Sequence, residues 1–311
     1  MATRGVGPAA VFKLFEPMRL DRLVTLSFAR SLRNLMDGSG VINRRKSVLP
    51  VLMYHSISKR DESHLKDYFK VCTPPERFRE QMEILQAAGY LGVDLETGLA
   101  RLEEGNGGCD RLVGITFDDG FLDFFTAALP VLQAKGFRAT MYLPTGFIGN
   151  VRREFLEIPC MTWDEVRAAR KTGMQFGSHT VHHPKLHGLP WSRIDQELTE
   201  SKRQLESELG ESVSAFAYPY AYPGVDRGFC HRFGERLRAA GYRSCVTTTI
   251  GRVRSRDEFL ELKRLPANAA DDGPLLLAKL NGDYDWLGLV QKAAKRFKRG
   301  NRTRNERKVP G

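Results

Sequence analysis

Short apolar runs alternate with amphipathic stretches from residue 47 to about residue 285. The runs are bounded by turn residues, which is typical of buried strands. The stretches between them place apolar residues three and four positions apart, which is typical of helices that pack on a sheet. Regular alternation of the two predicts a parallel sheet or barrel. The expected strands are 47–54, 112–117, 139–143, 174–178, 213–218, 244–248 and 262–265.

The stretches between the expected strands carry the start and stop signals of helices. Thr73-Pro-Pro-Glu76 and Thr162-Trp-Asp-Glu165 read as capping boxes, in which threonine and glutamate side chains satisfy free backbone N–H groups. A glycine follows most of these helices. No glycine-rich phosphate loop follows an early strand, which disfavours a Rossmann domain. We therefore predict one α/β domain, an irregular (β/α)7-type barrel spanning 47–285. One expected helix ends at 88 and a second passes through 132–135. The others span 163–172, 191–209, 230–240 and 274–280.

The net charge of +11 changes this picture only at the ends of the chain. Residues 1–46 carry nine Lys and Arg against three acidic residues, and residues 292–311 carry nine against one. The excess positive charge therefore lies outside the barrel, and we expect no specific nucleic-acid partner. We expect 1–46 to form a basic, partly amphipathic N-terminal extension and 286–311 to form a basic, disordered C-terminal tail.

The N-terminal extension contains one helical face, formed by Leu20, Leu23, Val24 and Phe28. Two interpretations stay open: the helix lies on an anionic membrane surface, or it packs on the flank of the barrel. The chain has no run of about 18 apolar residues, and its first 30 residues lack the pattern of a secretory signal. We expect a cytoplasmic protein, peripheral at the inner face of the membrane. Its five cysteines form no C-x-x-C pair, which disfavours a disulfide framework and a structural zinc site.

Acidic residues follow one of the expected strands directly. Asp118-Asp119-Gly120 comes after the strand at 112–117, and parallel barrels place their active sites at the C-terminal ends of strands. Adjacent side chains leaving a strand diverge, so one carboxylate can bind a metal ion while the other faces a water molecule. By itself, such a sequence is most often an ordinary turn.

Two further motifs follow expected strands. His179 and His183 come after 174–178, and two imidazoles with one carboxylate form a metal site with open positions for water and substrate. Histidine pairs also arise by chance. Tyr218-Pro219-Tyr220 ends the next strand, where the backbone N–H of Tyr220 can face a developing oxyanion. The alternative is a turn with aromatic packing at the barrel rim.

In this order, the three motifs resemble those of the polysaccharide deacetylase family, carbohydrate esterase family 4. The resemblance covers about 47–285 and includes Leu52-Met-Tyr-His55 at the first strand. It implies that Asp118 is the catalytic base and that the Tyr220 backbone N–H stabilises the oxyanion. It also implies three metal ligands, namely Asp119, His179 and His183.

His55 matches a histidine that some subgroups place near the site, where it is a candidate for the general acid. The alternative interpretation is that His55 has a structural role at the barrel mouth. His182 is expected to be exposed or to support the ligands.

Two positions depart from the family pattern. Ala221 stands where the family usually has glycine, so we expect the turn to differ or extend. Leu262-Lys-Arg-Leu265 stands where many members have Leu-x-His, as in the subgroup with a Tyr-Pro-Tyr motif. The departure leaves His55 as the candidate acid.

The resemblance implies a hydrolase that uses a divalent metal, Zn²⁺ in the first place. Its substrate would be the N-acetyl amide of an amino sugar in a polysaccharide, an oligosaccharide or a lipid-linked glycan precursor, and its product acetate. This activity would serve exopolysaccharide or cell-envelope glycan biosynthesis. The alternatives are a catalytically inactive carbohydrate-binding barrel and a relative that acts on a non-sugar amide. A non-haem iron oxygenase has a similar ligand set, but its all-β setting conflicts with the strand–helix alternation.

Overall fold

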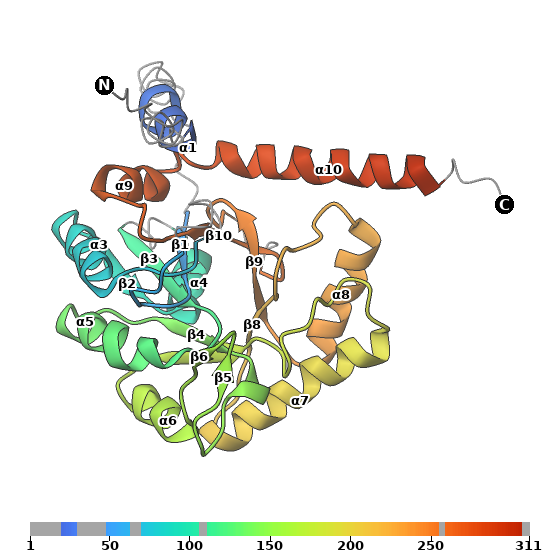
Figure 1. Cartoon of the computed structure of the whole chain (residues 1–311), viewed down its shortest axis with the longest axis horizontal. Coiled ribbons are helices and arrows are strands. Elements are labelled where there is room, and N and C mark those ends of the chain that lie inside the picture. The colour runs from blue at the N-terminus through green and yellow to red at the C-terminus, as the bar shows by residue number, and fades with distance from the viewer. Residues whose placement is uncertain (1–19, 30–47, 63–69, 106–110, 255–258, 307–311) are drawn as a thin grey trace, which may run out of the picture.

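Seven parallel strands form a closed barrel in the computed structural model, which describes residues 20–29, 48–62, 70–105, 111–254 and 259–306 (Figure 1). The ring closes because β1 pairs with both β3 and β10. The predicted (β/α)7-type barrel is thereby confirmed. Its strands, in ring order, are β1 (Val51–Tyr54), β3 (Leu112–Phe117), β4 (Thr140–Leu143), β7 (Gln175–Ser178), β8 (Ala215–Ala217), β9 (Ser244–Ile250) and β10 (Leu262–Pro266).

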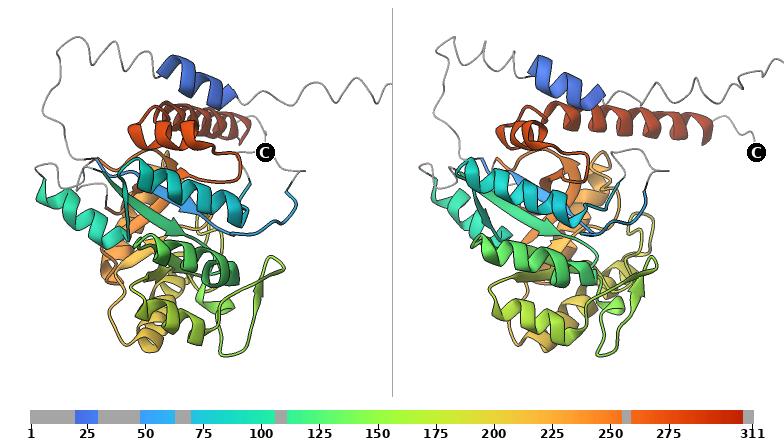
Figure 2. Two further views of the ribbon diagram at one scale, coloured as in Figure 1. Left: turned by 90° about the vertical axis from the view of Figure 1, so that its left-hand side faces the viewer. Right: turned by 60° about the vertical axis from the view of Figure 1, so that its left-hand side comes forward.

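Helices surround the barrel and cover the outer face of its strands (Figures 1 and 2). The longest helix around the barrel, α7, spans the 19 predicted residues and ends at Gly210, which has the left-handed conformation of a C-cap. The helices are α3 (Pro75–Ala87), α4 (Leu95–Glu104), the π-helix η5 (Phe124–Ala128) continued by α5 (Leu129–Ala134), α6 (Trp163–Lys171), α7 (Trp191–Leu209), α8 (Arg227–Ala239) and α9 (Gly273–Asn281).

The sequence analysis missed the short elements. Strand β2 (Leu91–Val93) pairs with the first half of β3, and helix α4 follows it. The two-residue strands β5 (Glu154–Phe155) and β6 (Ile158–Pro159) form a hairpin, and η6 (Thr145–Phe147) is a single 3₁₀ turn. Two or three residues are too few to show a periodic pattern, so β2, β5, β6 and η6 gave no signal. Helix α4 has ten residues and was missed as well.

The N-terminal helical segment and the start of the C-terminal helix lie side by side on one flank of the barrel (Figure 2). Residues of α1 (Leu20–Leu23) and η3 (Val24–Ala29) are bonded to the C-terminal part: Tyr284 donates to Asp21 over 2.9 Å, and the Trp286 indole donates to Thr25 over 3.2 Å. Over 20–29 the structure thus supports packing on the flank. The rest of the extension, 1–19 and 30–47, lies outside the described residues.

The expectation of a disordered tail from 286 onward is wrong for most of that segment. Helix α10 (Trp286–Glu306) begins where Trp286 and the adjacent Tyr284 pack on the N-terminal helix, and it continues past the barrel (Figure 1). Residues 307–311 lie outside the described ranges. Across the part of the chain that the structure describes, no helix is both long enough and apolar enough to cross a bilayer.

The two expected capping boxes have different outcomes. At α6 the Thr162 hydroxyl accepts from the Glu165 amide, and the Glu165 carboxylate accepts from the Thr162 amide. At α3 the N-cap is Pro74, and the Thr73 hydroxyl is buried with no hydrogen-bond partner. The Thr73 amide donates instead to the Ser56 carbonyl. Tertiary pairing has therefore replaced the expected cap.

This difference predicts that substitution of the two threonines will affect stability to different extents. Thr162→Ala should lower the free energy of unfolding by about 1 kcal/mol, since it removes a working cap. Thr73→Val should change it by less than about 0.5 kcal/mol, because no hydrogen bond of the hydroxyl is lost. Urea denaturation of both variants checks this. An equal loss for Thr73→Val would show that its hydroxyl does cap α3.

Candidate metal centre and active site

The end of β3 delivers two buried carboxylates that point in different directions. Asp119 and Gly120 both have left-handed backbones, with φ of 74° and 68°. At Gly120 a Cβ would lie 2.9 Å from the Leu143 side chain, so glycine is required there for space as well as conformation. The turn directs Asp118 toward β10 and Asp119 toward the loop after β7. The sequence analysis expected the two side chains to diverge, but it did not predict these directions.

Asp119 meets both predicted histidines. Its Oδ1 lies 3.6 Å from His179 Nε2 and 3.5 Å from His183 Nε2, and the two Nε2 atoms are 3.1 Å apart. All three side chains are buried. Among the described residues, this is the one cluster of three or more His, Cys, Asp or Glu that could hold a metal ion.

The loop after β7 fixes the orientation of the two imidazoles. The Nδ1 of His179 is 2.8 Å from the Ala217 carbonyl, which can only accept, so Nδ1 carries the proton and Nε2 presents a lone pair. The Thr180 hydroxyl accepts from the His183 amide, and Thr180 and His183 both have positive φ. Such backbone strain in non-glycine residues is typical of functional sites.

A buried glutamate from α7 supports the same loop. Glu197 accepts hydrogen bonds from the Val181 and His182 amides, over 2.9 and 3.0 Å, and from the His182 ring. The His182 side chain is therefore directed away from the metal ligands and is 59% exposed. This agrees with the prediction that His182 is exposed or supports the ligands.

The polar atoms present fit a cation. Asp119 Oδ1 is buried and has no hydrogen-bond partner. Burial, followed by the charge of Asp118, raises the pKa of Asp119 well above its usual range. Burial lowers the pKa of His179, and burial together with His179 lowers that of His183 to about 2, so both imidazoles are neutral ligands at neutral pH. A divalent cation would stabilise the ionised form of Asp119.

The buried negative charge of Asp118 is balanced by an arginine of the chain itself. The Arg264 guanidinium donates to both carboxylate oxygens, over 2.8 and 2.7 Å, and neither side chain is more than 3% exposed. Arg264 also donates to the Thr247 carbonyl and the Thr116 hydroxyl. Burial alone would raise the pKa of Asp118, but Arg264 holds it well below its usual range. Asp118 is therefore ionised at neutral pH.

His55 lies beside Asp118 at the end of β1. Its Nε2 is 3.8 Å from Asp118 Oδ2. Burial lowers the pKa of His55 to about 4, against the opposing effect of Asp118 and with the help of Arg264. The imidazole is thus neutral at neutral pH.

Tyr220 lies at the opposite side of the ligand cluster. Its ring is half-exposed and meets the His183 ring edge to face, with centroids 4.6 Å apart. Its backbone has a φ of 56°, whereas Ala221 has no positive φ. The left-handed residue of this turn is therefore Tyr220 itself, which explains why no glycine is needed at 221.

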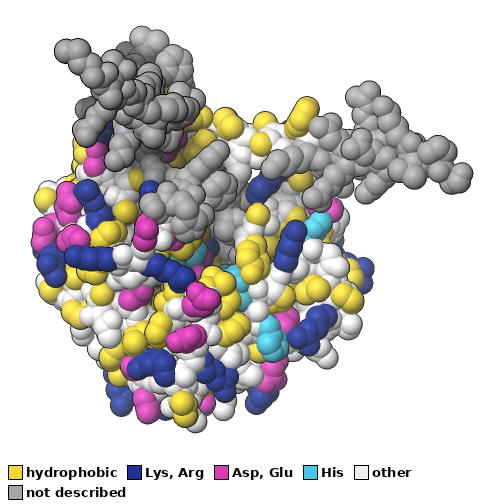
Figure 3. All heavy atoms as spheres, viewed as in Figure 1, with side chains coloured by type: hydrophobic (Ala, Val, Ile, Leu, Met, Phe, Trp, Pro, Cys, Tyr) yellow, Lys and Arg dark blue, Asp and Glu magenta, His cyan; other side chains and the backbone are white. Residues whose placement is uncertain are grey.

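A cavity of about 360 Å³ joins these residues. It is lined by all six predicted site residues and closed at one side by Leu156 and Ile158 of the β5–β6 hairpin. The Leu156 carbonyl accepts from Arg60 Nη1 over 2.9 Å, which links the hairpin to the loop after β1. Histidine side chains are visible in the hollow at the centre of this face (Figure 3).

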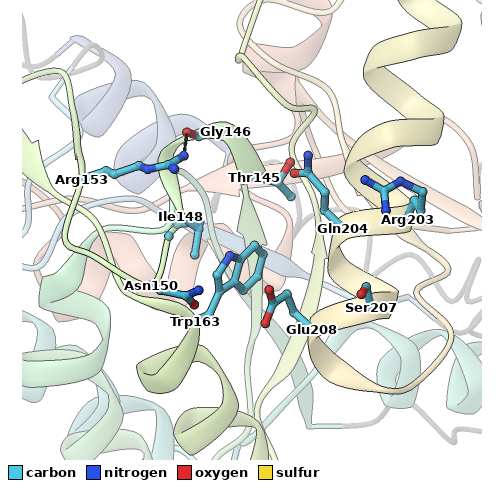
Figure 4. A pocket seen from close by; sticks show the side chains of 11 residues that line it. Thr145, Gly146, Ile148, Asn150, Arg153, Trp163, Arg203, Gln204, Ser207 and Glu208 are labelled. Carbon is cyan, nitrogen blue, oxygen red and sulfur yellow. Dashed lines mark hydrogen bonds between the residues drawn. The ribbon is translucent and has the colours of Figure 1, made fainter.

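A second cavity, of about 330 Å³, lies between α6, α7 and the turn after β4 (Figure 4). Its arginines are already engaged: Arg203 pairs with Glu200, and Arg153 donates to the Gly146 carbonyl. It is lined by no member of the histidine–aspartate cluster. We therefore assign the chemistry to the first cavity.

The structure unites every predicted site residue, and it adds two that the sequence analysis did not identify. Glu197 gave no local signal on a helix rich in glutamate. Arg264 did give one: in Leu262-Lys-Arg-Leu265 a charged residue occupies a position of a buried strand. The sequence analysis considered this segment only because many members of the family have a histidine there.

The fold and the site together define a class of protein, a parallel barrel with two histidines and one carboxylate that could hold a metal ion at the C-terminal ends of its strands. Residues 105–243 match the sequence model of the polysaccharide deacetylase family. The resemblance to this family that the sequence indicated is thereby confirmed over these residues.

Individual proteins and solved structures are also similar to this chain. The Bacillus subtilis (strain 168) protein YxkH is 29% identical over 227 residues, which cover 71% of this chain and 72% of YxkH. The structure of the Streptococcus pyogenes deacetylase PplD in complex with acetate has a TM-score of 0.64 and 25% identity, and the match covers 75% of this chain and 98% of PplD. Poly-β-1,6-N-acetyl-D-glucosamine N-deacetylase of Staphylococcus aureus is 28% identical over 126 residues, only 38% of this chain and 43% of that protein.

Single substitutions of three neighbouring histidines test the candidate metal site. His179→Ala and His183→Ala should each lower bound zinc per protein at least ~10-fold, because each removes one of three ligands. His182→Ala should retain the metal, since its ring contacts Glu197. Metal analysis after dialysis against zinc checks this. Zinc loss in His182→Ala with retention in His179→Ala would contradict the assignment.

Proposed function

We propose that this protein hydrolyses the N-acetyl amide of an amino sugar in a glycan and releases acetate. The observation that carries the proposal is the placement of ionised Asp118 beside the Asp119–His179–His183 cluster in one cavity. The S. aureus relatives act on poly-β-1,6-N-acetyl-D-glucosamine by name, and the PplD structure holds acetate. These names support an N-acetylglucosamine polymer, oligosaccharide or lipid-linked precursor as the substrate class.

We propose Zn²⁺ as the cofactor, held by Asp119, His179 and His183. Two neutral imidazoles and a carboxylate are ligands that zinc prefers. When bound, it supplies Lewis-acid chemistry, which polarises a carbonyl and makes water easier to deprotonate near neutral pH.

Asp118 acts as the general base in this proposal. Because Arg264 keeps it ionised, its carboxylate can accept a proton from the attacking water throughout the neutral range. Arg264 occupies both oxygens and so fixes the plane of the carboxylate. It is a positioning residue, since it reaches the reaction through Asp118.

His55 completes the proton path. An imidazole with a pKa of about 4 holds no proton to give at the start of the reaction. Its Nε2 is, however, 3.8 Å from Asp118 Oδ2. We infer that His55 receives the proton that Asp118 takes from water and passes it to the leaving amine.

Tyr220 contributes by its backbone and its ring. Its amide N–H stabilises the developing oxyanion, as proposed from the sequence. Tyr220 is 53% exposed and lines the cavity, where its ring offers a face for packing against a sugar.

Asp118→Asn tests the reaction and the division of roles. It should lower kcat for acetate release from N-acetylated oligosaccharides at least ~10²-fold, the usual contribution of a general base. Zinc content should stay near wild type, because Asp118 is not among the three ligands. The measurement is acetate release with parallel metal analysis. Loss of zinc in Asp118→Asn and retention in Asp119→Ala would reverse the two roles, and absence of acetate release by the wild type across the panel would refute the activity.

The pH dependence tests the proton path through His55. Because the lowered pKa keeps His55 neutral down to about pH 4, wild-type kcat/KM should show no decline linked to His55 between pH 6 and 8. His55→Ala should lower kcat at least ~10-fold at pH 7 with zinc content unchanged. The deficit should shrink as pH falls toward 4, where wild-type His55 is itself protonated. An alkaline decline between pH 6 and 8 that disappears in His55→Ala would show that His55 starts the reaction protonated.

A further inference from the structure

Helix α10 is attached to the wall of the cavity along its inner face. Gln291 donates to the Thr248 carbonyl over 2.9 Å and accepts from the Ile250 amide over 3.2 Å. Lys295 donates to the Tyr222 carbonyl over 2.8 Å. At Gly288 a Cβ would lie 2.3 Å from the Ile250 carbonyl oxygen, so the helix and β9 are in the closest contact that glycine permits.

The opposite face of α10 is apolar and exposed. Leu289 and Phe297 are each 72% exposed and Val290 is 50% exposed. Exposed Lys292 and Arg296 lie between them along the helix. We call these five residues the α10 outer face. Figure 3 shows hydrophobic side chains along the upper edge of the molecule, where α10 runs.

We propose that the α10 outer face binds the surface of an anionic lipid membrane. Large apolar side chains interleaved with Lys and Arg are typical of helices that lie in the membrane interface. Residues 292–311, which include Lys292 and Arg296 of this face, carry nine Lys and Arg against one acidic residue, which complements a negatively charged surface.

The charge and the exposed apolar residues of this face favour a membrane over a second copy of this chain and over a nucleic acid. A second copy of this chain would bring a like-charged face against this one. A nucleic acid would use the basic residues, but it would leave Leu289 and Phe297 in water. A lipid surface accommodates both kinds of side chain.

The attachment of α10 has a consequence for the substrate, and this step rests on the proposed function. Thr248 lines the cavity, and its hydroxyl donates to the Tyr220 carbonyl over 3.1 Å. Since Gln291 is bonded to the Thr248 carbonyl, the membrane-binding helix and the cavity wall form one unit. Docking would therefore hold the cavity next to the lipid surface, which suits a glycan carried on a lipid.

Vesicle sedimentation with the full chain tests the proposal without using catalysis. The protein should co-sediment at ~0.1 M salt with phosphatidylcholine vesicles that contain phosphatidylglycerol, and should be released near ~1 M salt. Pure phosphatidylcholine vesicles should bind at least ~10-fold less. The double variant Leu289→Glu/Phe297→Glu should lose at least ~10-fold in apparent affinity.

Val151→Glu is the matched control. Val151 is 78% exposed and lies outside α10, so this change adds an acidic residue at an exposed apolar position and should leave vesicle binding unchanged. All three proteins should release acetate from a soluble oligosaccharide at the same rate, which also shows that they are folded. If activity is absent from all of them while vesicle binding follows the expected order, the proposed function fails and this inference stands.

Three outcomes would overturn the inference. The double variant could bind vesicles as tightly as the wild type, which would assign binding to the basic ends alone. The wild type could ignore anionic vesicles and bind RNA instead. Light scattering could show a dimer that the double variant dissociates, which would make a second copy the occupant of the α10 outer face.

Discussion

Two adjacent buried carboxylates impose the main constraint on this structure. Asp118 and Asp119 are 2% and 6% exposed. A buried charge is stable only when an opposite charge and hydrogen bonds compensate it. The protein compensates Asp118 with Arg264, whereas Asp119 Oδ1 receives no hydrogen bond and faces two neutral imidazoles. One aspartate is thus balanced within the chain, and the other is suited to balancing by a cation.

This compensation depends on closure of the barrel. Arg264 lies 146 residues after Asp118 and reaches it because β1 pairs with both β3 and β10. Removing one partner of a buried ion pair typically destabilises a protein by about 3–5 kcal/mol. His179 is likewise oriented by a carbonyl of the neighbouring strand β8. The strands that close the ring therefore also position the charges of the site.

The local part of the fold and site could be predicted from the sequence, and the long-range part could not. The seven strands and the three motifs at strand ends follow from short-range patterns, so the positions of Asp118, His179 and Tyr220 were predictable. The contacts of Glu197 and Arg264 join distant segments, and no local pattern specifies them. The failed capping box at Thr73 has the same cause, because its amide pairs with Ser56 on another segment. Where a local preference and tertiary pairing compete, the pairing decides.

The ion pair that stabilises Asp118 also limits its chemistry. By holding the carboxylate ionised, Arg264 weakens it as a base, so a proton taken from water is held only briefly. A neutral acceptor close by would remove this limit, and His55 suits the role proposed for it, since burial keeps its imidazole uncharged at 3.8 Å from the carboxylate. The weak base and the neutral histidine are thus complementary. Burial lowers the pKa of His55 and Arg264 lowers that of Asp118, in the same barrel mouth that orients the candidate metal ligands.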